Sequence, residues 1–119
     1  MKFLVVDDSK TMRMIVKRTL RQAGYGEHEV VEAVNGKDGL EKAKEVSPDI
    51  ILCDWNMPEM NGLEFLQALN TEGIKIKFGF VTSEGTPEMK KTAAENGALF
   101  LISKPFTADT FKNQLGSVM

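Results

Sequence analysis

The stretch Ile50-Ile51-Leu52-Cys53-Asp54 decides the fold class, because four consecutive apolar residues end abruptly in a carboxylate. A strand buried on both faces loses the alternation of apolar and polar residues, so this run is typical of a strand inside a parallel sheet. Short apolar runs recur along the chain on either side of it. They lie at residues 3–6, 30–33, 76–81 and 99–102. We therefore predict five strands, of which residues 50–53 form the third.

Segments of helical length separate and follow these strands. They lie at residues 11–23, 37–46, 62–69, 87–96 and 108–118. Strands that alternate with helices in this way indicate β/α units, in which the helices cover a parallel sheet. The sequence thus predicts the α/β class, with a doubly wound five-stranded parallel sheet built from five β/α units. We expect one domain spanning residues 1–119.

Composition and charge exclude several classes of protein. The chain is 42% hydrophobic and 27% charged, which is typical of a globular domain, and its net charge of −2 gives no basic surface for nucleic acid. No apolar run approaches the ~20 residues of a membrane helix, and two acids interrupt the N-terminal stretch where a signal peptide would stay apolar. We expect a cytoplasmic protein with no membrane partner. Because no predicted helix has a second apolar stripe, we also expect a monomer.

Polar side chains follow four of the predicted strands. The first strand leads into Asp7 and Asp8, the third into Asp54, the fourth into Thr82 and the fifth towards Lys104. The carboxyl ends of parallel strands meet at one edge of the sheet, and ligands bind at that edge. The sequence therefore predicts that three carboxylates, a hydroxyl and an ammonium group lie close together.

This set of side chains indicates phosphoryl transfer. Two carboxylates 4 Å apart repel each other by on the order of 4 kcal/mol at an effective dielectric constant near 20, so the site requires cations. Lys104 supplies one, and a hard divalent ion such as Mg²⁺ suits a site of few carboxylates that keeps several waters. Asp54 is the candidate nucleophile, with Asp7 and Asp8 holding the metal. Thr82 and Lys104 would then contact the phosphoryl oxygens.

Four segments together resemble a known family. They are Val5-Val6-Asp7-Asp8-Ser9, Asp54-Trp55-Asn56-Met57-Pro58-Glu59-Met60-Asn61-Gly62, Val81-Thr82-Ser83-Glu84 and Ser103-Lys104-Pro105-Phe106. In this order and spacing they make the chain similar to the receiver domain of bacterial two-component response regulators, and to its CheY-like single-domain subfamily. The resemblance covers essentially all 119 residues. It implies a flavodoxin-like fold with the strand order 2-1-3-4-5 known for CheY-like proteins.

The resemblance also assigns the phosphoacceptor and the metal ligands. It implies that Asp54 is the phosphoacceptor and that Mg²⁺ is the cofactor. Asp8 would bind the metal directly, and Asp7 would act largely through water. Asp54 and the backbone carbonyl of Asn56 would complete the set of protein ligands.

Further residues have implied roles in catalysis and signal lifetime. By resemblance, Thr82 and Lys104 act together with Asp54 on the phosphoryl group, while Asn56 and Glu84 tune dephosphorylation. The resemblance implies a cis Lys104-Pro105 bond. Base rates alone favour trans, because only about 5% of X-Pro bonds in folded proteins are cis.

The implied switch and output surface include one departure from the family. Receiver domains usually place Tyr or Phe three residues before the lysine, and this chain has Leu101 there. The switch would therefore consist of Thr82 and Leu101, without an aromatic hydroxyl. Strand alternation places the neighbouring Phe100 on the opposite face of the sheet. The predicted output surface contains Met89, Lys90, Leu101 and Lys112.

The implied function is a stand-alone response regulator. A separate sensor or chemotaxis histidine kinase would donate the phosphoryl group, and the altered surface would bind a downstream effector protein. Control of the flagellar switch in chemotaxis is one candidate pathway. Such a protein assists its own phosphorylation and dephosphorylation but has no turnover substrate, so we do not expect an enzyme.

Two alternatives belong to other functional classes. A phosphatase of the haloacid dehalogenase type also uses an aspartyl nucleophile with Mg²⁺, but it places a second Asp two positions later, where this chain has Asn56. A flavodoxin-like cofactor binder requires a hydroxyl- and glycine-rich phosphate loop after the first strand. Asp7 and Asp8 occupy that loop here and would repel phosphate.

Overall fold

A parallel sheet of five strands lies at the centre of residues 1–118, which are the residues that the computed structural model describes. The strands are β1 (Lys2–Val6), β2 (Glu29–Ala33), β3 (Ile50–Cys53), β4 (Lys77–Thr82) and β5 (Phe100–Ser103). Their order across the sheet is β2-β1-β3-β4-β5, and all neighbouring pairs are parallel. This sheet confirms the predicted doubly wound α/β class and the strand order that the resemblance implies. The expected domain end at Met119 lies outside the described residues.

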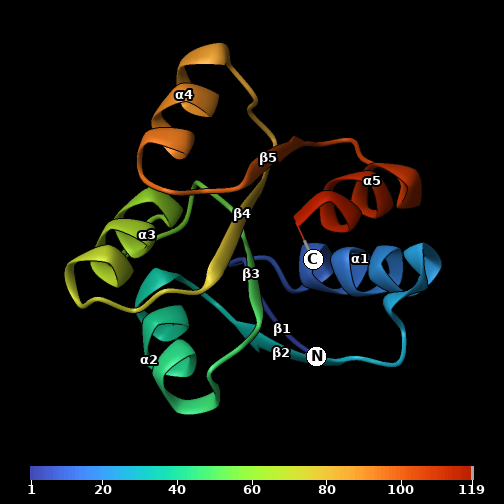
Figure 1. Cartoon of the computed structure of the whole chain (residues 1–119), viewed down its shortest axis with the longest axis horizontal. Helices are drawn as coiled ribbons and strands as arrows, with labels where there is room; N and C mark the ends of the chain where they lie inside the picture. Colours follow the sequence, from blue (N-terminus) through green and yellow to red (C-terminus); the bar gives the residue numbers. More distant parts are fainter. Residues whose placement is uncertain (119) are drawn as a thin grey trace.

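Helices cover both faces of the sheet (Figure 1). They are α1 (Lys10–Leu20), α2 (Gly36–Val46), α3 (Gly62–Thr71), α4 (Pro87–Glu95) and α5 (Ala108–Val118). Helices α1 and α5 pack on one face through a buried cluster that includes Leu20 and Phe111. Helices α2, α3 and α4 pack on the other face through a cluster that includes Phe65 and Phe78. Among residues 1–118, no helix has the length and apolar character needed to cross a membrane.

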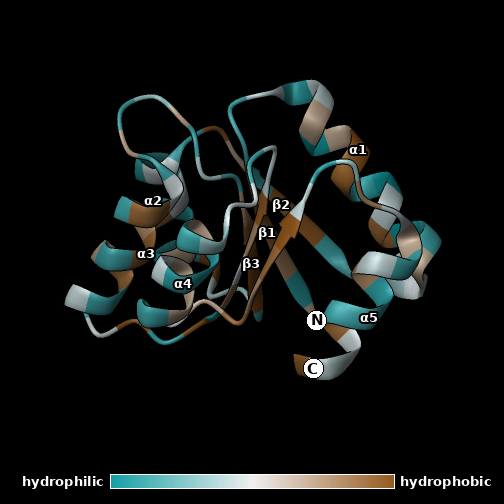
Figure 2. Cartoon of the chain, turned by 90° about the horizontal axis from the view of Figure 1, so that it is seen from above, coloured by the Kyte–Doolittle hydropathy of each residue, from teal (hydrophilic) through white to brown (hydrophobic). Residues whose placement is uncertain are grey.

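Strand β3 shows why the apolar run lacks alternation. Its residues are all buried, with Ile50 and Leu52 in the cluster under α1 and α5, and Ile51 and Cys53 in the cluster under the other helices. Figure 2 shows the central strands as largely hydrophobic and the helices as ribbons of mixed character. Each fully buried aliphatic side chain contributes about 1.5 to 3 kcal/mol to folding, so the two clusters together hold the sheet between its helices.

The strand register aligns the ends of neighbouring strands. Val6 of β1 is paired with Cys53 of β3, so the next residue of each strand emerges at the same edge. Thr82 of β4 is paired with Ser103 of β5 in the same way. Strands β4 and β5 each lie one residue later than predicted, because apolar residues mark burial rather than the limits of the hydrogen-bonded ladder.

Side-chain caps fix where the helices begin after the strand-end loops. The Ser9 hydroxyl accepts a hydrogen bond from the Met12 amide at 3.2 Å and starts α1. Asn61 and Glu64 form a reciprocal capping box that starts α3. A side-chain cap typically stabilises a helix by about 1 kcal/mol. These caps fix where the loops that follow β1 and β3 end.

The first helix differs from its predicted range of 11–23. It begins at Lys10 because Ser9 is the cap, and after α1 the chain continues into a short kinked segment, η1 (Arg21–Tyr25), whose helical path is broken at Gly24. Gly24 has a φ of 99°, a conformation that glycine adopts at little steric cost. The helical path is thus broken at Gly24, directly after the predicted end of the helix at residue 23.

Candidate functional site

Three carboxylates meet at the edge of the sheet where β1 and β3 end. Asp7, Asp8 and Asp54 each place one oxygen within 4.8 Å of those of the other two. Asp7 and Asp54 are buried, with 3% and 9% of their surface exposed, while Asp8 is exposed. The acids that the sequence placed at two strand ends therefore converge.

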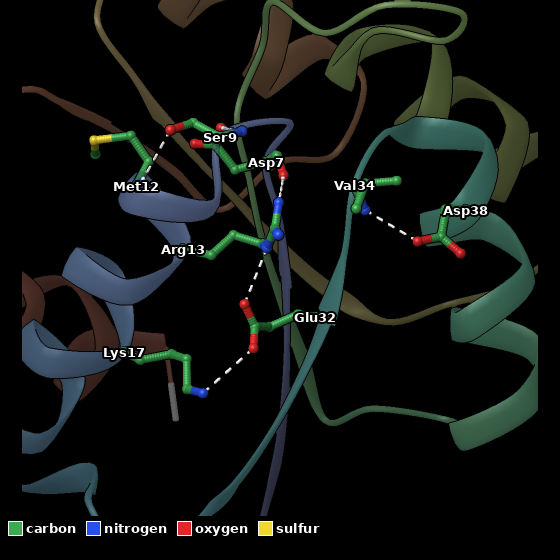
Figure 3. Close-up of polar contacts among 8 residues, drawn as sticks. All are labelled: Asp7, Ser9, Met12, Arg13, Lys17, Glu32, Val34 and Asp38. Carbon is green, nitrogen blue, oxygen red and sulfur yellow. Dashed lines mark hydrogen bonds and ion pairs between the residues drawn. The ribbon is translucent and has the colours of Figure 1, made fainter.

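Backbone and side-chain donors hold Asp7 in place (Figure 3). Its amide donates to the carbonyl of Ala33 on β2 at 3.1 Å, and its Oδ1 accepts from the Ser9 amide at 2.9 Å. The backbone carbonyl of Asp7 accepts from Nη1 of Arg13 at 2.6 Å. The end of β1 is thus fixed on three sides, so the Asp7 side chain has a defined direction.

Asp54 is held by the neighbouring strand and by the loop that follows it. Its amide donates to the carbonyl of Val6 at 2.9 Å, and its Oδ1 accepts from the Trp55 amide at 2.8 Å. The Gly62 amide closes this loop by donating to the carbonyl of Trp55 at 2.8 Å. Asn56 lies in the same loop, two residues after Asp54, and is exposed.

Contacts with the start of α2 anchor the far side of the same loop. The Gly36 amide donates to the carbonyl of Met60 at 3.0 Å, and Nδ2 of Asn35 donates to Oε2 of Glu59 at 3.0 Å. Glu59 has a φ of 65°, in the left-handed region that few non-glycine residues occupy. These two hydrogen bonds hold the loop in a conformation that its sequence alone disfavours.

The hydroxyl and the ammonium group approach from β4 and β5. Nζ of Lys104 lies 3.6 Å from Oδ2 of Asp7, and its side chain is 19% exposed. Thr82 is fully buried, and its Oγ1 accepts from the Glu84 amide at 3.3 Å. The Lys104 amide donates to the carbonyl of Thr82 at 2.8 Å, which ties the two strand ends together. The Lys104-Pro105 bond is cis, so the trans form that base rates favour is not adopted.

Electrostatic repulsion and burial perturb the two buried acids. Burial, followed by the negative charge of Asp7, raises the pKa of Asp54 from 3.8 to about 6. Burial also raises the pKa of Asp7, although the Ser9 amide and the Lys104 charge oppose the shift. Both acids therefore hold their protons more tightly than they would in water. A bound cation would relieve this repulsion, and the all-oxygen donor set suits a hard divalent ion.

Of the predicted switch residues, Thr82 lies at the acidic site and Leu101 lies on β5, while the other predicted output residues lie on α4 and α5. Leu101 of β5 is half-buried and packs with the cluster on the α4 side, whereas Phe100 belongs to the cluster under α1 and α5. The predicted alternation of these two side chains is confirmed. The other output residues are Met89 and Lys90 on α4 and Lys112 on α5, and Glu84, which is predicted to tune dephosphorylation, lies in the β4–α4 loop.

Sequence reasoning missed the ion pair behind the acidic site. Nε of Arg13 donates to Oε1 of Glu32 at 2.9 Å, and Nζ of Lys17 lies 3.3 Å from Oε2 of the same carboxylate (Figure 3). The one available signal was that Glu32 interrupts an apolar strand. A charged residue in a strand that packs against a helix favours a partner of opposite charge.

Comparison with known sequences gives the family. A sequence profile of the response regulator receiver domain matches residues 3–115. The chain belongs to this family. As a receiver domain it is 39% identical to the chemotaxis protein CheY1 of Helicobacter pylori (strain ATCC 700392 / 26695), over all of this chain and 97% of that protein. It is 40% identical to a chemotaxis protein CheY homolog of Campylobacter jejuni, over all of this chain and 92% of that protein.

Solved structures give the same relationship. The receiver domain superposes on chemotaxis protein CheY4 of Vibrio cholerae with a TM-score of 0.86 and 37% sequence identity, covering 99% of this chain and 98% of that one. The receiver domain is therefore CheY-like in sequence and in fold. Membership of this family does not favour the phosphatase or the flavodoxin-like cofactor binder.

The raised pKa of Asp54 predicts that the metal-free receiver domain loses folding stability as pH rises. Since the folded pKa of about 6 exceeds the ordinary value of 3.8, the stability that this group contributes is present below about pH 4 and is lost as pH rises through 6. Asp54→Asn cannot ionise, so it should raise the free energy of unfolding at pH 7 by about 1 to 3 kcal/mol. Urea denaturation in EDTA should show this gain at pH 7 and little of it near pH 4. An equal gain at both pH values would contradict the explanation.

Proposed function

We propose that this receiver domain is a phosphorylation switch in a phosphorelay and that Asp54 accepts the phosphoryl group. The observation that carries the proposal is the convergence of Asp7, Asp8 and Asp54 at the sheet edge, with Lys104 beside them. A site with one buried nucleophilic carboxylate and surrounding charge-stabilising groups suits phosphoryl transfer, which depends on positioning and on electrostatics.

Asp54 is the nucleophile in this proposal. One of its carboxylate oxygens attacks phosphorus and forms an acyl phosphate, while the bond from phosphorus to the donor nitrogen of a phosphohistidine breaks. The carboxylate must be ionised to attack, and its pKa of about 6 leaves it ionised at neutral pH. The backbone donation from Trp55 to Oδ1 holds the group in one orientation.

The side chains present fit a magnesium ion. Asp7, Asp8, Asp54 and the backbone carbonyl of Asn56 would hold it, and these donors are all oxygen atoms, as Mg²⁺ prefers. When bound, Mg²⁺ neutralises negative charge around the phosphoryl oxygens. The same charge would lower the pKa values of Asp7 and Asp54, whose burial otherwise favours the protonated forms.

Thr82 and Lys104 would sense the new phosphoryl group. Phosphorylation adds roughly −1.5 to −2 charges at pH 7, and both side chains can donate to the added oxygens. The Thr82 Oγ1 accepts from the Glu84 amide, so movement of the hydroxyl would shift the β4–α4 loop. Asn56 and Glu84 would set the lifetime of the acyl phosphate. Leu101 would respond by repacking on the α4 side.

The proposed partners are a histidine kinase as phosphodonor and a downstream effector protein. Effector binding would use the surface that contains Met89, Lys90, Leu101 and Lys112. The relatives named as chemotaxis proteins make chemotaxis, with the flagellar switch as effector, the favoured pathway. We propose a cytoplasmic monomer that binds neither nucleic acid nor membrane and that assists its own phosphorylation and dephosphorylation without a turnover substrate.

Labelling with acetyl phosphate tests this function directly. Incubation with acetyl phosphate and Mg²⁺ should add one phosphoryl group to the protein, as measured by intact mass. Omission of Mg²⁺ and addition of EDTA should remove most of the labelling, because repulsion among the three acids would then oppose the incoming phosphate. Labelling that is equally fast in EDTA would contradict the proposed role of the metal, and the absence of any labelling would contradict the function.

A further inference from the structure

Arg13 connects the acidic site to a partly buried ion pair between α1 and β2. Nη1 donates to the backbone carbonyl of Asp7 at 2.6 Å, while Nε donates to Oε1 of Glu32 at 2.9 Å (Figure 3). The Arg13 side chain is only 11% exposed. A charged donor that is largely excluded from water forms stronger hydrogen bonds than an exposed one, so we expect both contacts to restrain the guanidinium.

Glu32 keeps the guanidinium in this position. Burial tends to raise the pKa of Glu32, but hydrogen bonds from Arg13 and Lys17 outweigh burial and lower it. The carboxylate is therefore ionised at neutral pH. A planar guanidinium can point two N–H groups in fixed, different directions, and here one reaches the β2 carboxylate and the other reaches the end of β1.

The carbonyl group that accepts the Arg13 hydrogen bond lies between two of the three acids. It belongs to the peptide group that joins Asp7 to Asp8, the two acids that follow β1. Rotation of this peptide group would turn the two side chains relative to each other and relative to Asp54. The Ser9 amide holds the Asp7 carboxylate from one side, and Arg13 holds the peptide group from the other.

We propose that Arg13 is a positioning residue for the metal site, which fixes the Asp7-Asp8 peptide group and thereby the directions of both carboxylates. Glu32 acts through Arg13 by fixing the guanidinium. This inference rests on the proposed function in one respect, namely that Asp7 and Asp8 bind Mg²⁺.

The direction of the change in Mg²⁺ affinity distinguishes a positioning role of Arg13 from a purely electrostatic one. Arg13 carries a positive charge beside the backbone of Asp7, so its removal would leave the binding of a cation unchanged or tighten it if only charge mattered. If Arg13 instead positions the acids, its removal should weaken binding. Changes to residues that support metal ligands typically reduce affinity about 10- to 100-fold. We therefore expect Arg13→Ala to bind Mg²⁺ at least about tenfold more weakly than the wild type.

The experiment is a calorimetric Mg²⁺ titration of the full chain, without a phosphodonor, at a temperature where circular dichroism shows each variant to be folded. Arg13→Lys keeps the charge but cannot direct two donors as a guanidinium does, so we expect it to remain several-fold weaker than the wild type. Lys17→Ala is the matched control, because Lys17 contacts the same Glu32 but makes no hydrogen bond to Asp7. Its Mg²⁺ affinity should stay within about twofold of the wild type, since it removes only a partly exposed ion pair.

A metal-free measurement covers the case in which Arg13→Ala does not fold. In Arg13→Lys, the backbone amide of Asp8 should change its chemical shift, because its nitrogen is bonded to the carbonyl that Arg13 contacts. Wild-type affinity in both Arg13 variants, or tighter binding in Arg13→Ala, overturns the positioning role while the proposed function stands. Failure of the wild type to bind Mg²⁺ overturns both.

Discussion

Asp54→Asn is expected to abolish phosphorylation by acetyl phosphate. Asparagine has nearly the same shape as aspartate, and its side-chain oxygen can still accept from the Trp55 amide, which now donates to Oδ1 of Asp54 at 2.8 Å. The fold around the site should therefore persist. The neutral amide lacks the nucleophilic carboxylate, so the variant cannot form the acyl phosphate. Intact mass after incubation with Mg²⁺ should show the unmodified protein at times when the wild type is labelled.

Asp109→Asn is the matched control for this experiment. It makes the same chemical change at an exposed acid in the first turn of α5, outside the acidic site. Its labelling should equal that of the wild type. Full labelling of Asp54→Asn would show that another residue is the acceptor. Peptide mapping of the labelled wild type would then identify that residue.

The sequence predicted the fold because burial leaves a direct pattern in residue type. The run at residues 50–53 is apolar throughout since it lies between two helical layers, and all its side chains are buried. Strand order has no comparable local signal. The five strands could be arranged in several ways that satisfy the same apolar runs, so the order came from resemblance and is confirmed by the observed pairing.

Convergence of the acids was predictable for a related reason. Asp7 and Asp54 follow strands directly, and parallel strands bring their carboxyl ends to one edge whatever their order. The Arg13 contact was not predictable, because it depends on the rotation of α1 and on the approach of a side chain from β2. Residues 13 and 32 are far apart in sequence and share no motif. The geometry of the folded chain alone relates them.

Gly62→Ala is expected to destabilise the protein severely and to disturb the site. A Cβ atom at this position would overlap the carbonyl oxygen of Asp54 and would lie 2.9 Å from Cε1 of Phe80, which is fully buried. Neither neighbour can easily move, because one is backbone and the other is in the core. Overpacking of a core typically destabilises by 1 to 3 kcal/mol, and a backbone obstacle places this variant at the upper end, at about 3 kcal/mol. Urea denaturation measures the loss.

Gly116→Ala provides the contrast that makes this result specific. Gly116 lies in α5, and a Cβ atom there would have no heavy atom within 4 Å apart from its chain neighbours and the backbone of its own helix. Alanine should stabilise that helix by about 0.5 to 1 kcal/mol through its higher helix propensity.

For Gly62→Ala, the start of α3 must move away from β3, and the displaced Asp54 carbonyl carries its carboxylate away from Asp7. Acetyl phosphate should therefore label the folded fraction of Gly62→Ala more slowly than it labels wild type. Unchanged stability and labelling would show that the close approach of α3 to Asp54 does not hold the site together.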